Sequence, residues 1–243
     1  FLKVSGSVAG GLALGFYMTG KQNVAIADAG GGYASPNAWV RIGLDNSITI
    51  MCARSEMGQD VYTSMAMLVA EELEVDINKI KVEFAPPAEV YINSLLGGQL
   101  TGGSTADRDA WEKLRKAGAS ARMMLVAAAA DQWGVDAGQC KAANGAITGP
   151  GGKRVNYGQV AAKAATMEVP KEVALKPSSQ FKVVGNPKQK RLDTEAKVTG
   201  QAQFGIDTRV PGMLYAAVAM APMIGGKVAS YDDSRAKSMP GVK

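Results

Sequence analysis

One long alanine-rich segment constrains the fold more than any other part of the sequence. Small and apolar residues recur there at steps of three and four, which is the spacing of one face of an α-helix. The pattern predicts a helix from about Ser104 to Gly134 whose narrow stripe packs closely against a neighbouring element. The stripe consists of Ala106, Ala110, Leu114, Ala117, Ala121, Leu125 and Ala128.

The start of this predicted helix carries signals of its own. Asp107, Asp109 and Glu112 occupy the first turns, where the helix dipole favours negative charge. Ser104, followed three residues later by Asp107, resembles a capping box. These residues predict that Ser104 caps the helix.

Residues 37–168 combine strand and helix patterns in one predicted domain. Apolar residues alternate through 40–44 and 48–52 around a polar turn, which predicts a β-hairpin with one buried face. Helical spacing follows over 63–73, and residues 80–84 resemble a strand. A short strand around 146–148 and a small helix after Tyr157 complete the domain. The expected fold class is α+β.

A segment rich in Pro, Lys and Ser at 169–190 is expected to connect this domain to a second one. Strand patterns resume at 201–207 and 213–219, on either side of a Val-Pro-Gly turn. Residues 191–243 are therefore predicted to begin a second domain that is incomplete when the sequence ends. We expect a second chain, or a continuation of this one, to complete it.

Composition excludes several classes of function. The net charge of +5 is spread along the chain, and the densest basic patch, 188–191, is not interleaved with aromatic residues, which argues against nucleic-acid binding. Histidine, the commonest general base and metal ligand, is absent. Cys52 and Cys140 by themselves cannot build a disulfide framework, a zinc site or an iron–sulfur site. Chemistry at this chain must therefore come from a cofactor or a carboxylate.

Residues 1–36 resemble an export signal followed by a linker. Positions 4–20 are uncharged but short and rich in glycine, whereas a membrane span needs about 20 apolar residues. Alanine pairs spaced for signal cleavage lie between positions 25 and 29. Phe1-Leu-Lys3 resembles the right half of the twin-arginine (Tat) motif, which implies export of a folded cofactor protein to the periplasm. The segment is expected to stay as an inner-membrane anchor or docking helix; the alternative is a small-residue helix in the core.

Two polar, glycine-containing segments each lie just before a predicted helix. The first is Arg54-Ser-Glu-Met-Gly-Gln59, and the second is Gly97-Gly-Gln-Leu-Thr-Gly-Gly-Ser-Thr105. Free backbone amides at a helix start, beside glycines and hydroxyls, suit a phosphate or another anionic oxygen. Structural capping is an equal alternative, and the spacings of a P-loop and of a dinucleotide fingerprint are both missing.

Glu56 is a candidate catalytic base because it lies in the first of these turns, near Gln59. No adjacent residue is of a kind that obviously raises its pKa, and a salt bridge with Arg54 is an equal alternative. We therefore expect no catalytic residue in this chain.

The order of these segments resembles the molybdopterin-binding subunit of the xanthine dehydrogenase/aldehyde oxidase superfamily. The matching run is Glu-Met-Gly-Gln, a helix ending in Ala-Glu-Glu-Leu-Glu-Val, a strand, and Thr-Gly-Gly-Ser-Thr before Asp-Ala-Trp. The sequence is most similar to the branch of the isoquinoline 1-oxidoreductase beta subunit and membrane-bound aldehyde dehydrogenase. Residues 191–200 and 211–215 resemble the entry to the family's α/β hammerhead domain. The resemblance runs nearly the whole length of this chain but covers only the first part of a typical member.

This resemblance implies a molybdopterin-binding domain segment followed by the start of a hammerhead domain. By matching, the cofactor contacts come from Gly58, Gln59, Thr101, Gly102, Gly103, Ser104 and Thr105. Asp60 stands where the family commonly has glycine, which puts close backbone approach at that position in doubt. The glutamate that the family uses as a base near molybdenum lies far toward the carboxyl end, and no segment here matches it.

The implied function is part of a periplasmic molybdenum hydroxylase or dehydrogenase that oxidises aldehydes or N-heterocycles with oxygen from water. Its cofactor would be molybdenum–molybdopterin in the cytosine dinucleotide form. The remaining part of the molybdenum subunit, an iron–sulfur subunit and a cytochrome c with haem are the expected partners, and the chain is not expected to act alone. Two alternatives are a non-catalytic periplasmic scaffold of a redox complex and a stand-alone phosphate- or nucleotide-binding module.

Overall fold

A computed structural model of the protein describes residues 12–14 and 39–242. The chain divides into two compact units, the first ending at Gln201 and the second covering Ala202–Lys243. The first unit mixes helices with two small sheets, so the predicted α+β class is confirmed. It also contains both glycine-containing turns that the sequence singles out.

The main sheet has four strands in the order β1-β2-β3-β4. They are β1 (Leu12–Leu14), β2 (Val40–Ile42), β3 (Ile48–Cys52) and β4 (Ile80–Phe84). The predicted hairpin is the antiparallel pair β2–β3, in which Val40 lies opposite Ile50. Strand β4 instead pairs parallel to β3, because helix α1 (Val61–Leu73) carries the chain back between them.

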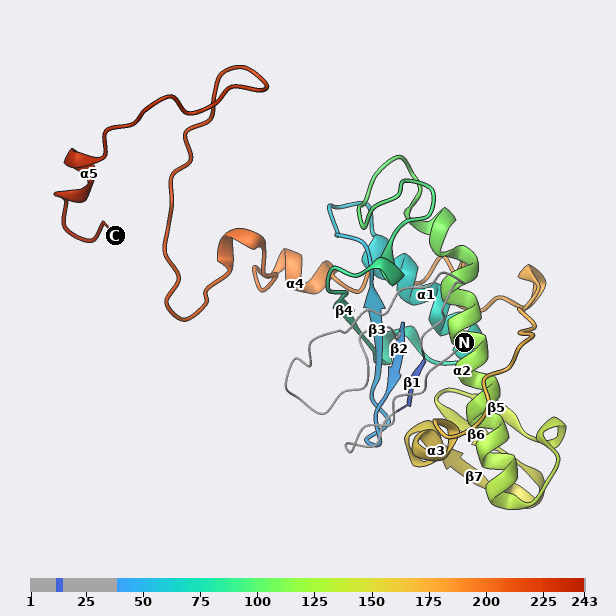
Figure 1. Cartoon of the computed structure of the whole chain (residues 1–243). Helices are drawn as coiled ribbons and strands as arrows, with labels where there is room; N and C mark the ends of the chain where they lie inside the picture. Colours follow the sequence, from blue (N-terminus) through green and yellow to red (C-terminus); the bar gives the residue numbers. More distant parts are fainter. Residues whose placement is uncertain (1–11, 15–38, 243) are drawn as a thin grey trace. The chain divides into compact units, whose positions relative to one another are not determined.

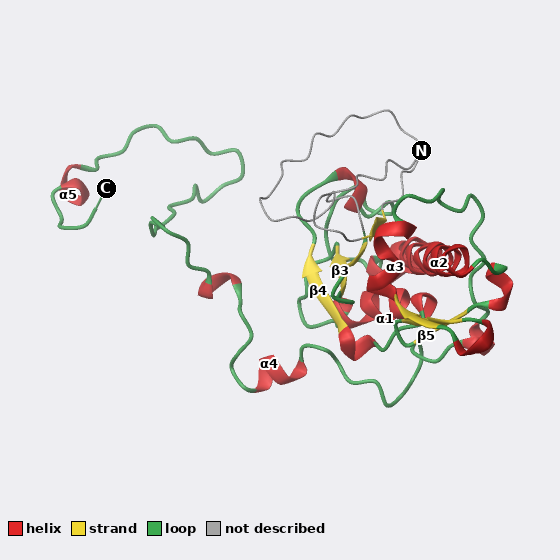
Figure 2. Ribbon diagram, turned by 90° about the horizontal axis from the view of Figure 1, so that it is seen from below, coloured by secondary structure: helices red, strands yellow, loops and turns green. Residues whose placement is uncertain are grey.

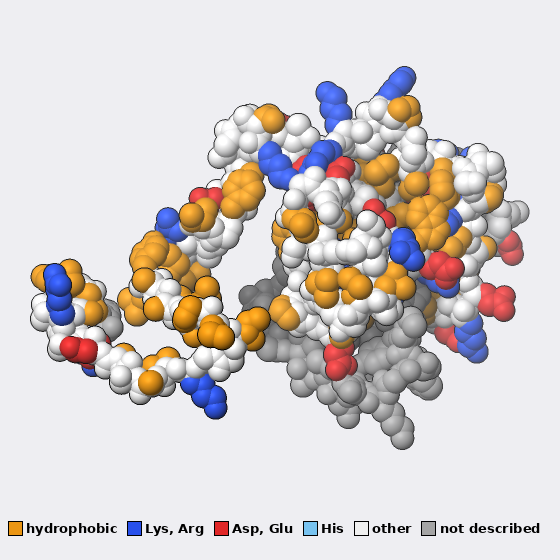
Figure 3. All heavy atoms as spheres, turned by 90° about the horizontal axis from the view of Figure 1, so that it is seen from above, with side chains coloured by type: hydrophobic (Ala, Val, Ile, Leu, Met, Phe, Trp, Pro, Cys, Tyr) orange, Lys and Arg blue, Asp and Glu red, His pale blue; other side chains and the backbone are white. Residues whose placement is uncertain are grey.

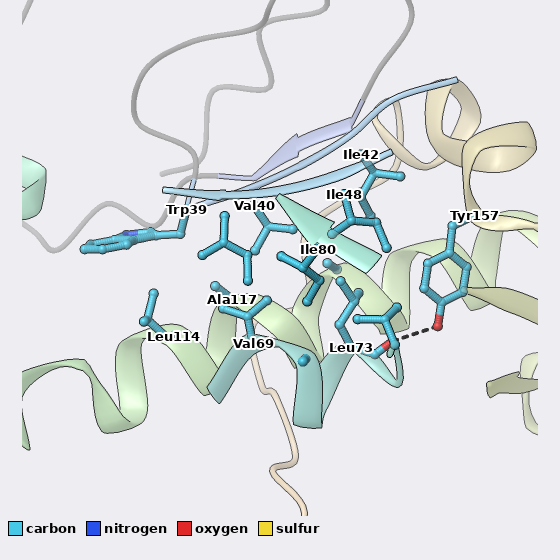
Figure 4. Close-up of a cluster of buried hydrophobic side chains, with 14 of the residues drawn as sticks. Trp39, Val40, Ile42, Ile48, Val69, Leu73, Ile80, Leu114, Ala117 and Tyr157 are labelled. Carbon is cyan, nitrogen blue, oxygen red and sulfur yellow. Dashed lines mark hydrogen bonds between the residues drawn. The ribbon is translucent and has the colours of Figure 1, made fainter. Parts of the chain in front are cut away.

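Helix α2 (Ala106–Trp133) packs along α1, and the two helices lie on one face of the main sheet (Figures 1 and 2). Figure 4 shows Val40 of the sheet on the side of Val69 of α1 and Leu114 of α2, and Ile42 farther along the sheet beside Ile48. These side chains are buried, and each contributes about 1.5–3 kcal/mol through removal from water.

The predicted small-residue stripe forms the contact between the two long helices. Its alanines are buried along the length of α2. At Gly118, a Cβ atom would lie 2.7 Å from the carbonyl oxygen of Val69 and 3.1 Å from the Cβ of Glu72. The helices therefore approach to a separation that only glycine permits at this position.

A second, smaller sheet follows α2. It is antiparallel and consists of β5 (Lys141–Ala143), β6 (Ala146–Thr148) and β7 (Arg154–Asn156), after which helix α3 (Tyr157–Ala164) begins. The predicted strand around 146–148 and the helix after Tyr157 are thus confirmed. The buried Tyr157 hydroxyl donates a hydrogen bond of 2.7 Å to the Leu73 carbonyl, which ties α3 to the end of α1.

Residues 169–190 have little regular structure but are anchored to the first unit by two buried carboxylates of α1. Glu71 Oε2 accepts hydrogen bonds of 2.8, 2.7 and 3.1 Å from the backbone amides of residues 182–184. Glu72 pairs with Arg115 of α2 at 2.7 Å and accepts a bond from the same segment. The segment predicted as a connector is therefore fixed on the helices rather than free.

Residues 202–242 form no strand, so the strands predicted at 201–207 and 213–219 are wrong for this chain. Gly205–Asp207 is a 3-10 turn, and short helices occur at α4 (Thr194–Val198), in the first unit, and at α5 (Ser234–Lys237). Apolar side chains of the second unit are exposed (Figure 3). An alternating pattern becomes a strand only beside a partner strand and an apolar face, and the described residues of this unit supply neither.

Most of the predicted export signal, with its cleavage positions and linker, lies outside the described residues. The described part, Leu12–Leu14, pairs antiparallel with Val40–Ile42 at the edge of the main sheet. In the part of the chain that the structure describes, no helix combines the length and apolar character needed to cross a membrane.

Candidate functional site

The two glycine-containing turns lie at the same end of the first unit. The first turn (residues 54–60) connects the end of β3 to the start of α1, and the second turn (residues 97–105) leads into α2. Both lie near the top of Figure 1, at the end toward which β3 points. Strand β3 and the two helices therefore place the turns beside each other although about 40 residues separate them in sequence.

A direct hydrogen bond joins the two turns. Thr101 Oγ1 donates to the Ser55 carbonyl oxygen at 2.8 Å. Next to this contact, Ser64 of α1 donates to the Asp107 carboxylate of α2 at 2.8 Å. Residues that the sequence predicted to share one ligand are thus brought together by the fold.

A buried ion pair fixes the bases of both turns. Arg54 Nη2 lies 2.7 Å from Asp109 Oδ2, and the two side chains are exposed by only 1% and 3%. Burial by itself would raise the pKa of Asp109, but hydrogen bonds from Lys113 and from the Ser94 amide outweigh burial and lower it. Arg54 also donates to the Tyr91 carbonyl at 2.7 Å. The alternative of an Arg54–Glu56 salt bridge is therefore wrong, because Arg54 points into the core toward Asp109.

Glu56 is bound by the backbone of its own turn. Its carboxylate accepts hydrogen bonds from the amides of Gly58, Asp60 and Tyr62 at 2.6, 3.1 and 3.1 Å. Partial burial opposes ionisation, but these three amides and nearby Lys197 outweigh it, and the pKa of Glu56 is lowered. A lowered pKa makes Glu56 a weaker base, and backbone amides already occupy its carboxylate.

The same hydrogen bonds limit what Gly58 can offer a ligand. Its amide already donates to Glu56 at 2.6 Å. The Gly58 N–H is therefore not free to bind a ligand, although a glycine-containing turn suggests that it would be. Gly58 nevertheless has φ +100°, and a Cβ placed there would meet no atom within 4 Å. A ligand can therefore approach the bare Cα, and the neighbouring Gln59 side chain is exposed.

Asp60 adopts a conformation that favours glycine. Its φ is 73° and its ψ is 25°, in the left-handed region, which explains in physical terms why glycine suits this position. The Asp60 carboxylate turns to Arg191, whose Nε lies 3.2 Å from Oδ1.

The second turn is held together by Thr105. The Thr105 hydroxyl donates to the Gly102 carbonyl at 2.8 Å and accepts from buried Asn93 Nδ2 at 2.7 Å. Its hydrogen-bonding capacity is thus used within the turn. Gly103 and Ser104 both have positive φ, 58° and 52°, and both are exposed, which leaves them at the surface of the turn.

The start of α2 lacks the cap that the sequence predicts. Thr105, not Ser104, is the N-cap residue, and its side chain makes no capping hydrogen bond, so the expected capping box is wrong. The reason is that the Thr105 hydroxyl points back to Gly102 and Ser104 lies in a left-handed conformation outside the helix. The amides of Ala106, Asp107 and Arg108 are first-turn donors, which have no intrahelical partner. Donors of this kind at a helix start can bind an anionic group.

Comparison with known proteins decides the family. Residues 5–208 match the family described as "Molybdopterin cofactor-binding domain". The chain belongs to this family. The resemblance that the motifs carry is therefore confirmed.

Two curated relatives resemble this molybdopterin cofactor-binding chain over most of its length. The membrane-bound aldehyde dehydrogenase [pyrroloquinoline-quinone] of Gluconacetobacter polyoxogenes is 36% identical over 87% of the chain and 27% of its own length. The isoquinoline 1-oxidoreductase subunit beta of Brevundimonas diminuta is 31% identical over 100% of the chain and 36% of its own length. The chain thus spans about a third of the relatives' length.

Among solved structures, the Cu,Mo-CO dehydrogenase matches 51% of the chain and 15% of its own chain, at 20% identity and a TM-score of 0.40. Quinoline 2-oxidoreductase from Pseudomonas putida 86 matches the same shares at 16% identity and a TM-score of 0.39.

The donors at the two turns fit the anionic part of a molybdopterin cofactor. Uncapped amides at the start of α2, the exposed Ser104 and the open space at Gly58 are suited to phosphate and other anionic oxygens. In the described parts of the chain, no three His, Cys, Asp or Glu side chains are grouped so as to hold a metal ion.

Exposed apolar side chains border the molybdopterin-domain turns. Met57 is 63% exposed, and Leu95, Leu96 and Leu100 in the loop before α2 are also exposed. Figure 3 looks down on the end of the molecule where these loops lie, and it shows apolar side chains gathered on that face. Such a surface suits contact with an apolar group or with further polypeptide.

Sequence reasoning missed two residues that hold the molybdopterin-domain turns, Asn93 and Arg191, and it gave Glu56 a different role. Asn93, which orients Thr105, is fully buried. The Glu56 side chain, considered as a base, is instead the internal acceptor of its own turn. Arg191 donates to the Gly58 carbonyl from 133 residues away in sequence. Only the Glu56 role had a local signal, because its acceptor bonds span two to six residues, whereas the contacts of Asn93 and Arg191 depend on the fold.

Proposed function

We propose that this chain supplies part of the molybdenum-cofactor site of an oxidoreductase that acts on aldehydes or N-heterocycles. The observation that carries the proposal is the hydrogen bond of 2.8 Å that joins Thr101 to Ser55, because it makes one shared site of the two turns. The family match supports the cofactor, and the names of the two relatives support the two substrate classes.

In this site the backbone would carry most of the binding. The amides of residues 106–108 and the hydroxyl of Ser104 would bind phosphate or pyrophosphate oxygens of the cofactor's tail, for which we propose the cytosine dinucleotide form. The Gln59 amide can both donate to and accept from the polar pterin ring. Thr101 positions the second turn through its bond to the first, and Thr105 with Asn93 keeps its shape.

The bound cofactor supplies the redox chemistry. In the overall reaction an aldehyde and water give a carboxylic acid, two protons and two electrons, and an N-heterocycle is hydroxylated with the same balance. The chain's own residues bind and orient the cofactor, whereas the base and the substrate pocket would come from polypeptide outside it. Electrons would leave through an iron–sulfur subunit and a haem-containing cytochrome.

We further propose a periplasmic enzyme associated with the inner membrane. The support is the half motif Phe1-Leu-Lys3 with the apolar segment after it. Sequencing of the mature amino terminus of the exported enzyme tests this proposal. A mature protein that is found in the cytoplasm with residues 1–36 intact would contradict it.

The name of the Gluconacetobacter relative includes pyrroloquinoline quinone, whereas the matching family binds molybdopterin. We favour molybdopterin for this chain because the family match spans residues 5–208 and the uncapped helix start suits a phosphate-bearing ligand. Molybdenum and pterin analysis of the isolated enzyme, with quinone analysis beside it, separates the two. An enzyme with quinone but without molybdenum would overturn the proposal.

A Gln59→Ala variant tests the site directly. Loss of the exposed amide should remove hydrogen bonds to the cofactor and weaken its binding by about 1–3 kcal/mol. Gln132→Ala, at an exposed position near the other end of α2, is the matched control. The measurement is the molybdenum-to-protein ratio of the purified enzyme together with its turnover. Equal molybdenum content in Gln59→Ala and Gln132→Ala would contradict the site, and an active complex without molybdenum in the wild type would favour a scaffold role.

A further inference from the structure

The backbone of the first turn is held from within by one carboxylate. Glu56 Oε1 accepts from Gly58 N at 2.6 Å and Asp60 N at 3.1 Å, while Oε2 accepts from Tyr62 N at 3.1 Å. The turn thus closes around an acceptor that belongs to the protein. Bonds to a charged acceptor are stronger than bonds between neutral groups, so this carboxylate limits the freedom of the peptides on both sides of Gln59.

A guanidinium from a distant segment holds the carbonyl side of the same turn. Arg191 Nη1 donates to the Gly58 carbonyl at 3.1 Å. Arg191 Nη2 lies 3.5 Å from Glu56 Oε1, and its Nε lies 3.2 Å from Asp60 Oδ1. Both the N–H and the C=O of Gly58 are therefore engaged, one by Glu56 and the other by Arg191.

Arg191 is itself fixed by its neighbours. Its Nε and Nη2 each donate to the Asp193 carboxylate at 3.0 Å, and Lys197 of α4 pairs with Asp193 at 2.5 Å. The Leu192 amide donates to Thr63 Oγ1 of α1 at 3.1 Å. Residues 191–197 are thus seated beside the first turn by several independent bonds.

The turn needs such support because its backbone is unfavourable directly after Gln59, at Asp60. Gly58 has φ 100° and Asp60 has φ 73°, and a non-glycine residue in the left-handed region costs free energy unless its surroundings fix it. Capping of α1 alone would account for the bond to Tyr62, but it does not account for a guanidinium bonded to the Gly58 carbonyl.

We propose that Glu56 and Arg191 are positioning residues that act as a clasp on the first turn and hold Gln59 in the conformation that meets the cofactor. This inference rests on the proposed function and adds to it that residues 191–197, from the segment expected to begin a second domain, belong to the cofactor site. Glu56 and Arg191 touch the turn rather than the cofactor.

The test uses the assembled enzyme carrying Glu56→Gln, Arg191→Met or Arg191→Lys. Glu195→Gln and Lys190→Met are matched controls, because each removes a charge close in sequence to Arg191 from an exposed side chain. Hydrogen exchange of the peptide covering 57–62 is measured by mass spectrometry, with residues 65–73 of α1 as an internal reference. The second measurement is the molybdenum-to-protein ratio.

We expect amide exchange over 57–62 to be roughly tenfold or more faster in Glu56→Gln and Arg191→Met, because hydrogen bonds to charged groups are lost. Exchange over residues 65–73 of α1 stays unchanged, and so does exchange over 57–62 in both controls. Molybdenum content falls in Glu56→Gln and Arg191→Met. Arg191→Lys keeps the positive charge but loses the several N–H donors of the guanidinium. It should therefore restore molybdenum content only in part.

The possible outcomes distinguish failure of the positioning role of Glu56 and Arg191 from failure of the proposed cofactor site. Unchanged exchange over 57–62 overturns the clasp whatever the molybdenum content is. Faster exchange with full molybdenum content, while Gln59→Ala loses molybdenum, overturns the positioning role and leaves the proposed site standing. Faster exchange with full molybdenum content in every variant, Gln59→Ala included, overturns the proposed function.

Discussion

Asp109 is the residue on which the geometry of both turns depends. Its carboxylate accepts from Arg54 of the first turn, from Lys113 on the next turn of α2, and from the Ser94 amide in the loop before the second turn. Because Arg54 and Asp109 are almost fully buried, neither charge can turn to water if its partner is removed. A buried pair of this kind fixes geometry more than it adds stability.

Asp109→Ala should therefore destabilise the protein strongly. An unpaired buried guanidinium costs about 3–5 kcal/mol, and urea unfolding of the first unit measures the change. Asp107→Ala is the matched control, because Asp107 also lies in the first turn of α2 but is exposed. Its loss should cost no more than about 1 kcal/mol.

A double variant tests whether the loss of stability comes from leaving one buried charge without its partner. Replacement of both partners, Arg54→Met with Asp109→Leu, removes the buried charge altogether and should recover part of the lost stability. A double variant as unstable as the sum of its single variants would show that the two charges act independently and would contradict the pairing.

The contact between α1 and α2 is set by Gly118. Alanine favours a helix over glycine by about 1 kcal/mol, so Gly118→Ala would stabilise α2 if space allowed. A Cβ at this position would lie 2.7 Å from the Val69 carbonyl, and the helices would have to move apart. We expect a net loss of about 1–3 kcal/mol from overpacking.

Thermal unfolding of Gly118→Ala beside Gln132→Ala checks this expectation. Gln132 is exposed on the same helix, and its replacement should change the stability by less than about 0.5 kcal/mol. A more stable Gly118→Ala protein would mean that helix propensity outweighs the close approach of α1 and α2.

The elements that the sequence predicts are those whose pattern is local. Helix α2 follows from the spacing of its small residues, and the hairpin β2–β3 follows from alternation around a polar turn. The N-cap of α2 is predicted at Ser104 but lies at Thr105. The Thr105 hydroxyl is bonded to Gly102 and Asn93, contacts that spacing does not reveal. The anchoring of residues 169–190 is hidden from the sequence for the same reason. Glu71 accepts a hydrogen bond from the amide of Lys182, more than a hundred residues away.

The candidate site is also only partly predictable from the sequence. The presence of two donor-rich turns before two helices is visible in the sequence, and the fold brings them together through Thr101 and Ser55. What the sequence could not show is which donors are already used. The Gly58 amide is taken by Glu56 and the Thr105 hydroxyl by Gly102, so the exposed donors of Gln59 and Ser104 and the start of α2 remain for a ligand.

At the scale of the whole molecule, the two units differ in how they bury apolar side chains. The first unit has a continuous core beneath its main sheet, whereas apolar residues of the second unit are exposed, among them Leu214, Val218 and Ile224. Residues 213–219 form a continuous apolar run, predicted as a strand, that has no partner strand among the described residues. Surface of this kind is costly in water at about 25 cal/mol per Å², so we expect it to be covered by other polypeptide in the assembled enzyme.

Hydrogen exchange over residues 202–242 tests this expectation. In the 243-residue chain alone the amides of 213–219 should exchange nearly as fast as those of an unfolded peptide, because no ladder protects them. In the enzyme assembled with the rest of its molybdenum subunit, pairing with neighbouring strands should slow their exchange by about 100-fold or more. Val218→Lys should leave the chain alone unaffected but lower the yield of the assembled enzyme, whereas Lys227→Met, at an exposed site in the same unit, should not. Equal exchange rates in the free chain and in the assembled enzyme would contradict the expectation that other polypeptide covers this segment.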